Sequence, residues 1–149
     1  MNIEEIKREI VSKGIKVIIC RGISGAGKST LATFILENFR NFKHFEADMY
    51  FMKNGVYQFD GTKLGSAHGW CQSSVQKALE GGGKVIVSNT FTTHREIKPY
   101  VEIAKSLGVP FMVVKCVGKW RNEHNVPDEV LQKMRDRWQD VDGEVIYEI

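Results

Sequence analysis

The sequence predicts an α/β fold, a three-layer sandwich with a mainly parallel sheet. Short apolar runs of strand length alternate with longer segments whose apolar residues recur at helical spacing. The runs, such as residues 17–20, are continuous, which is typical of strands buried on both faces. No run approaches the roughly 20 residues that span a membrane, and 149 residues suit one domain. We therefore expect a single domain, residues 1–149, without a membrane helix.

Each element follows from its apolar spacing. Ile3, Ile6 and Ile10 predict a first helix that stops at Ser12-Lys13-Gly14. The same spacing predicts further helices over residues 31–39, 64–79, 97–107 and 130–138. Continuous apolar runs predict strands over residues 16–20, 44–47, 85–87 and 111–116, and the tail 144–149 is a candidate edge strand. Residues 49–60 are aromatic and show no period, so they are expected to be irregular.

Charge and cysteine content exclude several classes of protein. The net charge of +3, from 21 basic and 18 acidic residues, is too small to indicate a nucleic-acid-coating protein. Three widely spaced cysteines, Cys20, Cys71 and Cys116, exclude a disulfide framework and a zinc site, and we expect buried, reduced thiols. The first residues lack the features of a signal peptide. The expected location is the cytoplasm, that of the host if the protein is phage-encoded.

Residues 22–29 match the phosphate-binding loop pattern G-x-x-x-x-G-K-[ST], after a predicted strand and at the start of a predicted helix. Glycines let successive backbone N–H groups surround a polyphosphate at the positive end of the helix dipole. We expect ATP and Mg²⁺, with Lys28 on the β- and γ-phosphates and the Ser29 hydroxyl on the metal. An ordinary Gly-rich turn is the alternative. The predicted nucleotide-binding residues are Gly22, Ile23, Ser24, Gly25, Ala26, Gly27, Lys28, Ser29 and Thr30.

Two polar residues follow predicted strands. Asp48 comes after the second strand, where a carboxylate can face the γ-phosphate and deprotonate an acceptor hydroxyl. Asp48 is therefore the predicted general base and, with Ser29, a predicted metal ligand; a cap is the alternative. Asn89 follows the third strand, where its amide can bind water or a phosphate oxygen without adding charge. A simple turn residue is the alternative for Asn89.

Arg121 begins the polar stretch 121–127, between the fourth strand and the last helix. We predict a lid over ATP in which Arg121 neutralises the charge that develops during phosphoryl transfer. The predicted catalytic residues are thus Lys28, Asp48 and Arg121.

Aromatic residues gather after Asp48 in the sequence. They can stack on a base or nucleoside, with core packing as the alternative. Tyr50 and Phe51, together with Asn89, are the candidate acceptor contacts. The aromatic set is Tyr50, Phe51, Tyr57, Phe59 and Trp70.

With these motifs the chain resembles the P-loop kinase family that includes phage polynucleotide 5′-kinase domains and the ATP-binding domain of NEDD4-binding-protein-2-like proteins. The resemblance implies ATP-dependent phosphorylation of a hydroxyl on DNA, RNA or a nucleoside, with Asp48 as base and Arg121 in the lid. It covers nearly the whole chain and rests on Arg21 to Thr30, Asp48 with Tyr50-Phe51, Tyr57-Gln58-Phe59 with Ala67-His68, Val87 to Thr90, Lys98-Pro99-Tyr100, and Arg121 to Val126 before Met134.

Two departures from the family pattern concern the acceptor. In the end-phosphorylating kinases an arginine three residues after the base holds the acceptor phosphate, and here that residue is Phe51. Their third strand ends in Asp-Thr, which here is Asn89-Thr90.

The acceptor expected first is a polynucleotide 5′-hydroxyl. The alternative is the hydroxymethyl group of 5-hydroxymethyluracil in phage DNA, the substrate of a related phage group, because an aromatic residue suits stacking on a flipped base. An ATP-binding or ATPase switch module is the alternative of another class. The sequence leaves the oligomeric state open.

Overall fold

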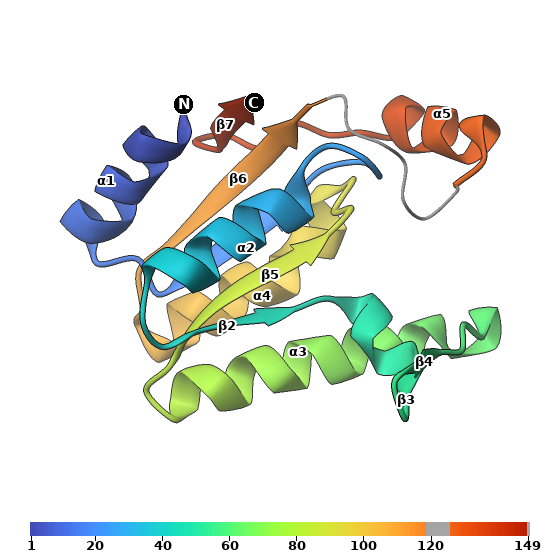
Figure 1. Cartoon of the computed structure of the whole chain (residues 1–149), viewed down its shortest axis with the longest axis horizontal. Helices are drawn as coiled ribbons and strands as arrows, with labels where there is room; N and C mark the ends of the chain where they lie inside the picture. Colours follow the sequence, from blue (N-terminus) through green and yellow to red (C-terminus); the bar gives the residue numbers. More distant parts are fainter. Residues whose placement is uncertain (119–125, 149) are drawn as a thin grey trace.

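Five parallel strands form one sheet in the order β2-β5-β1-β6-β7 (Figure 1). The computed structural model describes residues 1–118 and 126–148. The strands are β1 (Val17–Arg21), β2 (Phe42–Phe45), β5 (Lys84–Asn89), β6 (Phe111–Val117) and β7 (Val145–Glu148). The helices are α1 (Ile3–Lys13), α2 (Lys28–Asn38), α3 (Leu64–Glu80), α4 (His94–Leu107) and α5 (Asp128–Asp136).

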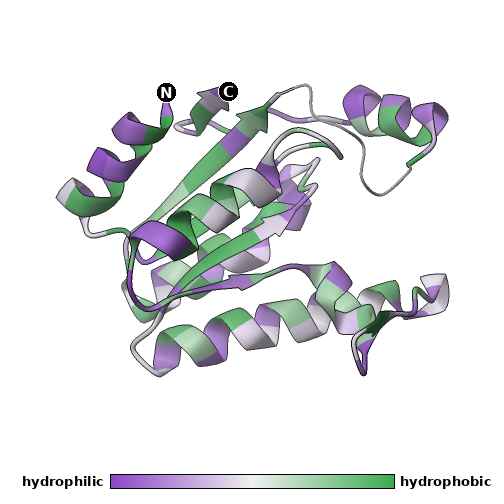
Figure 2. Cartoon of the chain, viewed as in Figure 1, coloured by the Kyte–Doolittle hydropathy of each residue, from purple (hydrophilic) through white to green (hydrophobic). Residues whose placement is uncertain are grey.

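Helices cover both faces of the sheet, so the predicted three-layer sandwich is confirmed (Figure 1). On one face α1 and α2 pack apolar residues such as Ile6 and Leu31 against Ile18 of β1. On the other face α3 and α4 pack residues such as Val75 against Ile19. The central strands β1 and β6 are mostly apolar along their length, whereas the helices carry apolar and polar residues on different faces (Figure 2). The structure therefore has two apolar clusters, one on each face of the sheet, with β1 between them.

The first helix and the first strand illustrate how local sequence specifies these elements. Helix α1 begins with a capping box, in which Asn2 accepts from the Glu5 amide and the Glu5 side chain accepts from the Asn2 amide. It ends at Gly14 in the left-handed conformation that glycine adopts most readily. Strand β1 is buried at all five positions. Its neighbours on both sides are β5 and β6.

The order of the strands creates a crevice at one edge of the sheet. The chain runs from β1 outward to β2 and back to β5, then crosses β1 to reach β6 and β7. The connections therefore leave β1 in opposite directions, and ligands bind at such a switch point beyond the carboxyl ends of the strands. The residues after β1, β2 and β5 all lie at this edge. None of the helices in the described ranges is long and apolar enough to cross a membrane.

Three sequence-based expectations differ from the structure. The segment 49–60, expected to be irregular, contains a 3₁₀ turn η1 (Ala47–Phe51) and a small hairpin of β3 (Met52–Lys53) and β4 (Val56–Tyr57). It is followed by a second 3₁₀ turn, η2 (Gly61–Lys63). His68, which the apolar spacing of residues 64–79 places on the apolar side of its predicted helix, is exposed in the structure, because the buried face of α3 begins at Ala67. The last helix begins at Asp128 rather than at residue 130, with two acidic residues in its first turn.

Candidate active site

The phosphate-binding loop connects β1 to α2 at the crevice. Gly25 and Gly27 have φ angles of 83° and 101°, in the region that favours glycine. Gly22 is needed for space, since a Cβ there would lie 3.0 Å from the Ala26 Cβ and 3.1 Å from the Cys116 carbonyl oxygen. No described side chain caps the N-terminus of α2, and its first turn has no acidic residue. The loop is therefore shaped for an anion at a helix N-terminus, and it fits the polyphosphate of ATP.

Lys28 folds back over this loop. Its Nζ donates to the carbonyl oxygens of Gly22 at 2.6 Å and Ile23 at 3.1 Å. Burial lowers the pKa of the Lys28 ammonium, and the nearby Glu46 and Asp48 carboxylates act in the opposite direction. The ammonium is thus held by the loop, and the acidic residues that follow β2 are near enough to favour its charged form. Ser29 and Thr30, in the first turn of α2, are exposed.

Two cysteines lie beneath the loop. The Cys20 and Cys116 sulfur atoms, on adjacent strands, are 3.5 Å apart and buried. The neighbouring Cys20 thiol and burial raise the pKa of Cys116, which favours its protonated form. All three cysteines are free and buried, as expected from the sequence. The floor of the loop is therefore apolar and uncharged.

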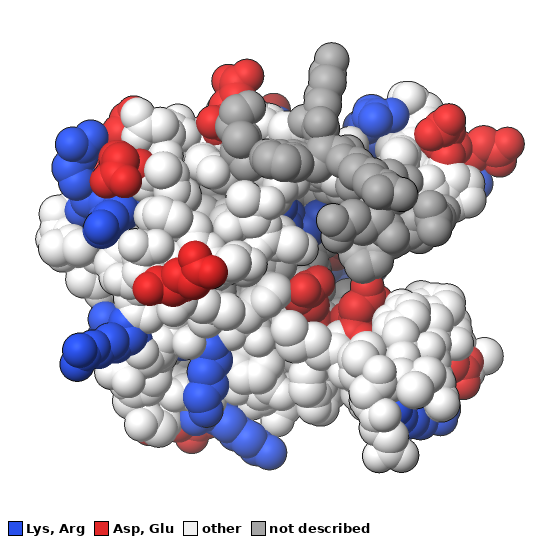
Figure 3. Space-filling model, in the orientation of Figure 1, with Lys and Arg blue, Asp and Glu red and all other residues white. Residues whose placement is uncertain are grey.

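Asp48 lies on η1, which follows β2 at this edge of the sheet, and its side chain is exposed. The Tyr57 hydroxyl donates to Asp48 Oδ1 over 3.4 Å. The start of η1 is held by Asn89 at the end of β5, whose Oδ1 accepts from the Ala47 amide at 2.9 Å. Asn89 thus uses one amide atom to position the element that carries Asp48. In Figure 3 acidic side chains lie at the inner end of a hollow between the lobe with η1 and the part with α5.

Asn89 belongs to a buried polar cluster with Tyr100 and Cys71. The Asn89 Nδ2 and the Tyr100 hydroxyl are buried without a hydrogen-bond partner in the described ranges. Both are neighbours of the Cys71 thiol, but the contacts fall outside hydrogen-bond geometry. Burial raises the pKa of the Tyr100 hydroxyl, and Cys71 adds to this effect. On the other side of β5, His44 Nε2 lies 3.1 Å from Ser88 Oγ and 3.6 Å from Glu46 Oε1.

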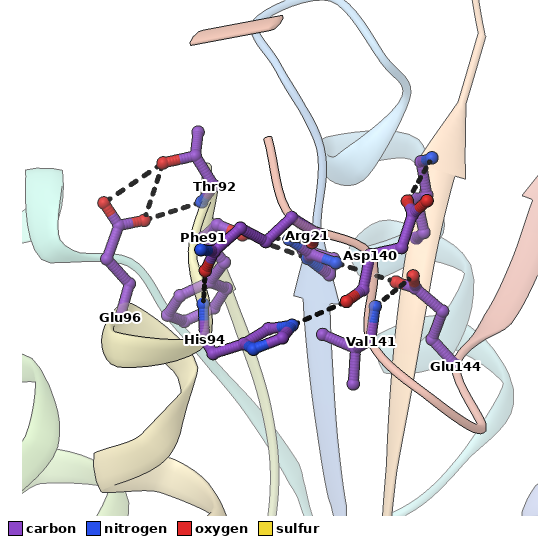
Figure 4. A network of polar contacts seen from close by, with 10 residues as sticks. Arg21, Phe91, Thr92, His94, Glu96, Asp140, Val141 and Glu144 are labelled. Atoms are coloured by element: carbon purple, nitrogen blue, oxygen red, sulfur yellow. Dashed lines mark hydrogen bonds and ion pairs between the residues drawn. The ribbon is translucent and has the colours of Figure 1, made fainter. Parts of the chain in front are cut away.

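Arg21, the residue before the loop, is fully buried (Figure 4). Its Nη1 is 2.9 Å from Glu144 Oε1, and its Nε and Nη2 donate to the Phe91 carbonyl at 3.0 and 2.7 Å. Nη2 also donates to the Gln139 carbonyl at 2.7 Å, and the guanidinium carbon lies 4.0 Å from the centre of the Trp138 ring. Arg21 therefore joins three segments that are distant in sequence at the edge of the sheet.

A cavity of about 840 Å³ opens beside the loop. Its walls are the loop itself, the end of β6, and residues of the C-terminal segment, among them Arg135 and Trp138. The Lys115 Nζ lies 5.3 Å from the centre of the Trp138 ring. The cavity combines an aromatic ring, two basic side chains and the loop, which suits a nucleotide base and sugar next to the phosphate position.

Residues 17–141 match the AAA_33 family, described as an AAA domain. The chain belongs to the AAA_33 family. This membership confirms the expected P-loop kinase type of domain, for which the family implies ATP binding. Human NEDD4-binding protein 2 is 30% identical to the AAA_33 chain over 144 residues, which are 90% of this chain but only 8% of that protein. The chain therefore matches one small part of a much larger relative.

Solved structures share the fold of this AAA_33 domain. A chain of the Pnkp1/Rnl/Hen1 complex has a TM-score of 0.59 and 21% identity, with 80% of this chain and 38% of that chain covered. The Mycobacterium tuberculosis APS kinase CysC, in complex with AMPPNP and APS, has a TM-score of 0.60 and 16% identity, with 89% and 87% covered. At these identities the likeness concerns the fold.

The sequence-predicted residues of the AAA_33 domain fall into three groups. The loop residues 22–30 and Asp48 lie on elements that meet at the same edge of the sheet. Phe51 is buried, with 2% of its surface exposed, and Tyr50 is half-buried, so the Phe51 ring has no free face for a substrate. Arg121 lies outside the described residues.

Sequence reasoning missed the residues that come from distant segments. The apolar spacing places Trp138 only at the end of a helix, and Lys115 and Arg135 belong to a stretch with a weak excess of basic residues. A tryptophan after an amphipathic helix with basic residues in its last turn is a signal that could have identified the wall of a pocket. Asn89 is predicted as a ligand contact, whereas its Oδ1 holds the backbone of η1.

Proposed function

We propose that this chain is one kinase domain, residues 1–149, that transfers the γ-phosphate of ATP to a hydroxyl of a nucleic acid or nucleoside. The observation that carries the proposal is that Lys28 folds over the phosphate-binding loop while Asp48 follows β2 at the same edge of the sheet. An ammonium in that position can neutralise the transferring phosphate while a carboxylate accepts the proton of the attacking hydroxyl.

The residues fit ATP with Mg²⁺. The loop offers uncapped backbone N–H groups, and Ser29 and Asp48 offer the oxygen ligands that Mg²⁺ prefers. In the described ranges no cluster of three His, Cys, Asp or Glu side chains is present. Phosphate oxygens and water would therefore complete the coordination of a metal held by Ser29 and Asp48, and the metal would shield the charge of the phosphates. Arg121 is proposed as the lid residue that adds positive charge during transfer.

The first proposed acceptor is a polynucleotide 5′-hydroxyl. A nucleic-acid acceptor agrees with the likeness of the fold to a chain of the Pnkp1/Rnl/Hen1 RNA repair complex. The exposed aromatic residues next to Asp48 favour a second candidate, the hydroxymethyl group of 5-hydroxymethyluracil in DNA, because they offer a surface for a base. The alternative of another class is an ATPase switch module without a phosphorylated acceptor.

The proposal is tested with γ-labelled ATP and a panel of acceptors: 5′-hydroxyl DNA, 5′-hydroxyl RNA, end-blocked DNA with 5-hydroxymethyluracil, and free nucleosides. Label on the ends supports the first acceptor, and label on end-blocked DNA supports the second. Release of free phosphate without labelling of any acceptor supports the ATPase alternative and contradicts the kinase proposal. Lys28→Met is the negative control for contaminating kinases.

A further inference from the structure

We propose that residues 52–59, the β3–β4 hairpin and the two residues after it, form a stacking platform for a base of a single-stranded nucleic acid, with Lys53 and Lys63 beside it as contacts for a backbone phosphate. The inference rests on the proposed function, for which it names the acceptor class and the surface that holds it. Four observations support it: the exposure of two aromatic rings, their support from the core, their distance to Asp48, and the charge beside them.

Two aromatic rings are exposed side by side on this hairpin. Tyr57 and Phe59 are 50% and 56% exposed, and their rings are nearly parallel, with centres 6.5 Å apart and planes inclined by 20°. Large aromatic side chains are usually buried. Met52, which pairs with Tyr57 across the hairpin, is also exposed. Exposed apolar side chains that lie together in this way mark a binding surface.

The Tyr57 and Phe59 rings pack against the buried Phe51. Phe51 is buried and meets Phe59 edge-on at 5.1 Å and Tyr57 edge-on at 6.3 Å between ring centres. The Gln58 amide donates to the Phe51 carbonyl at 2.8 Å, which fixes the backbone between the two rings. The Asn54-Gly55 turn has positive φ at both residues, as a tight hairpin requires. The platform is thus preorganised, so binding a base costs little ordering of the side chains.

The platform adjoins the candidate base. The Tyr57 hydroxyl donates to Asp48 Oδ1, so one ring of the pair is anchored beside the carboxylate proposed as the base. A nucleobase stacked on the exposed Tyr57 ring would bring its attached sugar, or a substituent of the base itself, toward Asp48. Figure 3 shows this lobe as largely uncharged on the side of the hollow, with a basic and an acidic patch on its other sides.

Positive charge lies beside the rings. Lys53 and Lys63 line a cavity of about 450 Å³ together with the Phe59 ring and Asp60. Asp60 is the acidic group that faces them, and its Oδ1 already accepts from the Thr62 amide at 3.0 Å and the Thr62 hydroxyl at 2.6 Å. Two ammonium groups against one carboxylate leave a net positive site. A planar base next to an anion is the repeating unit of a nucleic-acid strand, and only an unpaired strand exposes the faces of its bases.

The test is binding of a 3′-labelled 12-nucleotide single strand with a 5′-hydroxyl, measured by fluorescence anisotropy without ATP. Tyr57→Ala/Phe59→Ala is expected to weaken binding by about 5- to 100-fold, the usual effect of losing base stacking. Tyr57→Phe keeps the ring and should bind within about twofold of wild type. Lys53→Gln/Lys63→Gln should reduce the dependence of the binding constant on salt. Leu36→Ala/Val11→Ala, at exposed apolar positions elsewhere, is the matched control.

Each outcome bears on the inference. Equal affinity of wild type and Tyr57→Ala/Phe59→Ala overturns it, as does the absence of strand binding by wild type at micromolar concentration. A change in oligomeric state of the double variant without a change in strand affinity would make the patch a self-association surface and also overturns it. If an acceptor is phosphorylated but the rings do not affect strand binding, the kinase proposal stands and this inference fails. Ring-dependent strand binding without phosphorylation of any acceptor would support the stacking platform and contradict the kinase proposal.

Discussion

The guanidinium of Arg21 and the carboxylate of Glu144 form a buried ion pair, with Nη1 and Oε1 2.9 Å apart and the side chains 0% and 7% exposed. The second Glu144 oxygen accepts from the Val141 amide at 2.8 Å, so the pair also closes the turn that leads into β7. Arg21 directly precedes the phosphate-binding loop, and the Trp138 ring stacks on its guanidinium. The ion pair therefore attaches the C-terminal segment, a wall of the cavity beside the loop, to the central strand.

Arg21→Met is expected to lower the free energy of unfolding by about 3–5 kcal/mol, because it leaves the Glu144 carboxylate buried without its partner. Urea unfolding followed by circular dichroism measures the change. Lys13→Met, which removes the exposed Lys13–Glu9 pair, is the matched control and should change stability by no more than about 0.5 kcal/mol. Equal effects of the two substitutions would contradict a structural role for the buried pair.

His44 should make stability depend on pH. Burial lowers the pKa of His44 in the folded state, so below neutral pH the unfolded chain binds more protons than the folded chain. This contribution to stability is fully present at pH values above the unfolded pKa of about 6.5 and is lost as the pH falls through the interval between that value and the lower folded pKa. Because one proton is involved, the free energy of unfolding changes by at most about 1.4 kcal/mol per pH unit in this interval.

The free energy of unfolding of His44→Asn should therefore change less between pH 7 and pH 5 than that of wild type. Urea titrations at a series of pH values provide the comparison. The exposed His68 on α3 supplies the control, since His68→Asn should keep the wild-type dependence. A His44→Asn profile that coincides with wild type would show that the buried histidine does not control this transition.

Gly22→Ala should disrupt nucleotide binding. The added Cβ would meet the Ala26 Cβ at 3.0 Å and the Cys116 carbonyl at 3.1 Å, and a backbone oxygen cannot move without shifting β6. We expect a loss of about 1–3 kcal/mol in stability from overpacking, and weaker binding of a fluorescent ATP analogue. Gly69→Ala on α3, whose Cβ would meet nothing within 4 Å, should instead leave nucleotide binding unchanged and raise helix stability by up to about 1 kcal/mol.

The cysteines should be unreactive in the folded protein. All three are buried, burial raises the pKa of Cys71, and the adjacent Cys20 thiol together with burial raises that of Cys116. Thiolates are the reactive form, so a disulfide reagent should modify these residues only at the rate at which the protein opens. Ser12→Cys, at an exposed position of α1, is the positive control. Rapid labelling of native wild type would contradict the buried floor beneath the loop.

The fold could be predicted from the sequence because its signals are local. The continuous apolar runs of β1 and β6 and the apolar spacing of α1 each occupy a few consecutive residues. The hairpin at residues 52–59 was missed although Asn54-Gly55 is a strong turn signal, because its strands have only two residues each and show no alternation. The exposure of His68 depends on a shift of the buried face of α3 by one residue, which apolar spacing does not resolve.

The site could be predicted only in part for the same reason. The loop and Asp48 follow strands and are visible in sequence. The environment of Arg21 is not, because its partner Glu144 lies 123 residues away and a basic residue at a strand end is usually exposed. The wall formed by Trp138 likewise depends on where the C-terminal segment packs.

The most direct test of the proposed kinase function is Asp48→Asn, assayed for ATP binding and for transfer of labelled γ-phosphate to the preferred acceptor. We predict that ATP still binds, with an affinity lowered only through the proposed metal contact of Asp48. At saturating ATP, transfer should be reduced by at least about 100-fold, the usual contribution of a general base. Glu37→Gln, an exposed acidic position on α2, should retain wild-type transfer. Transfer by Asp48→Asn within a few-fold of wild type, at full ATP occupancy, would contradict the role of Asp48 as the base.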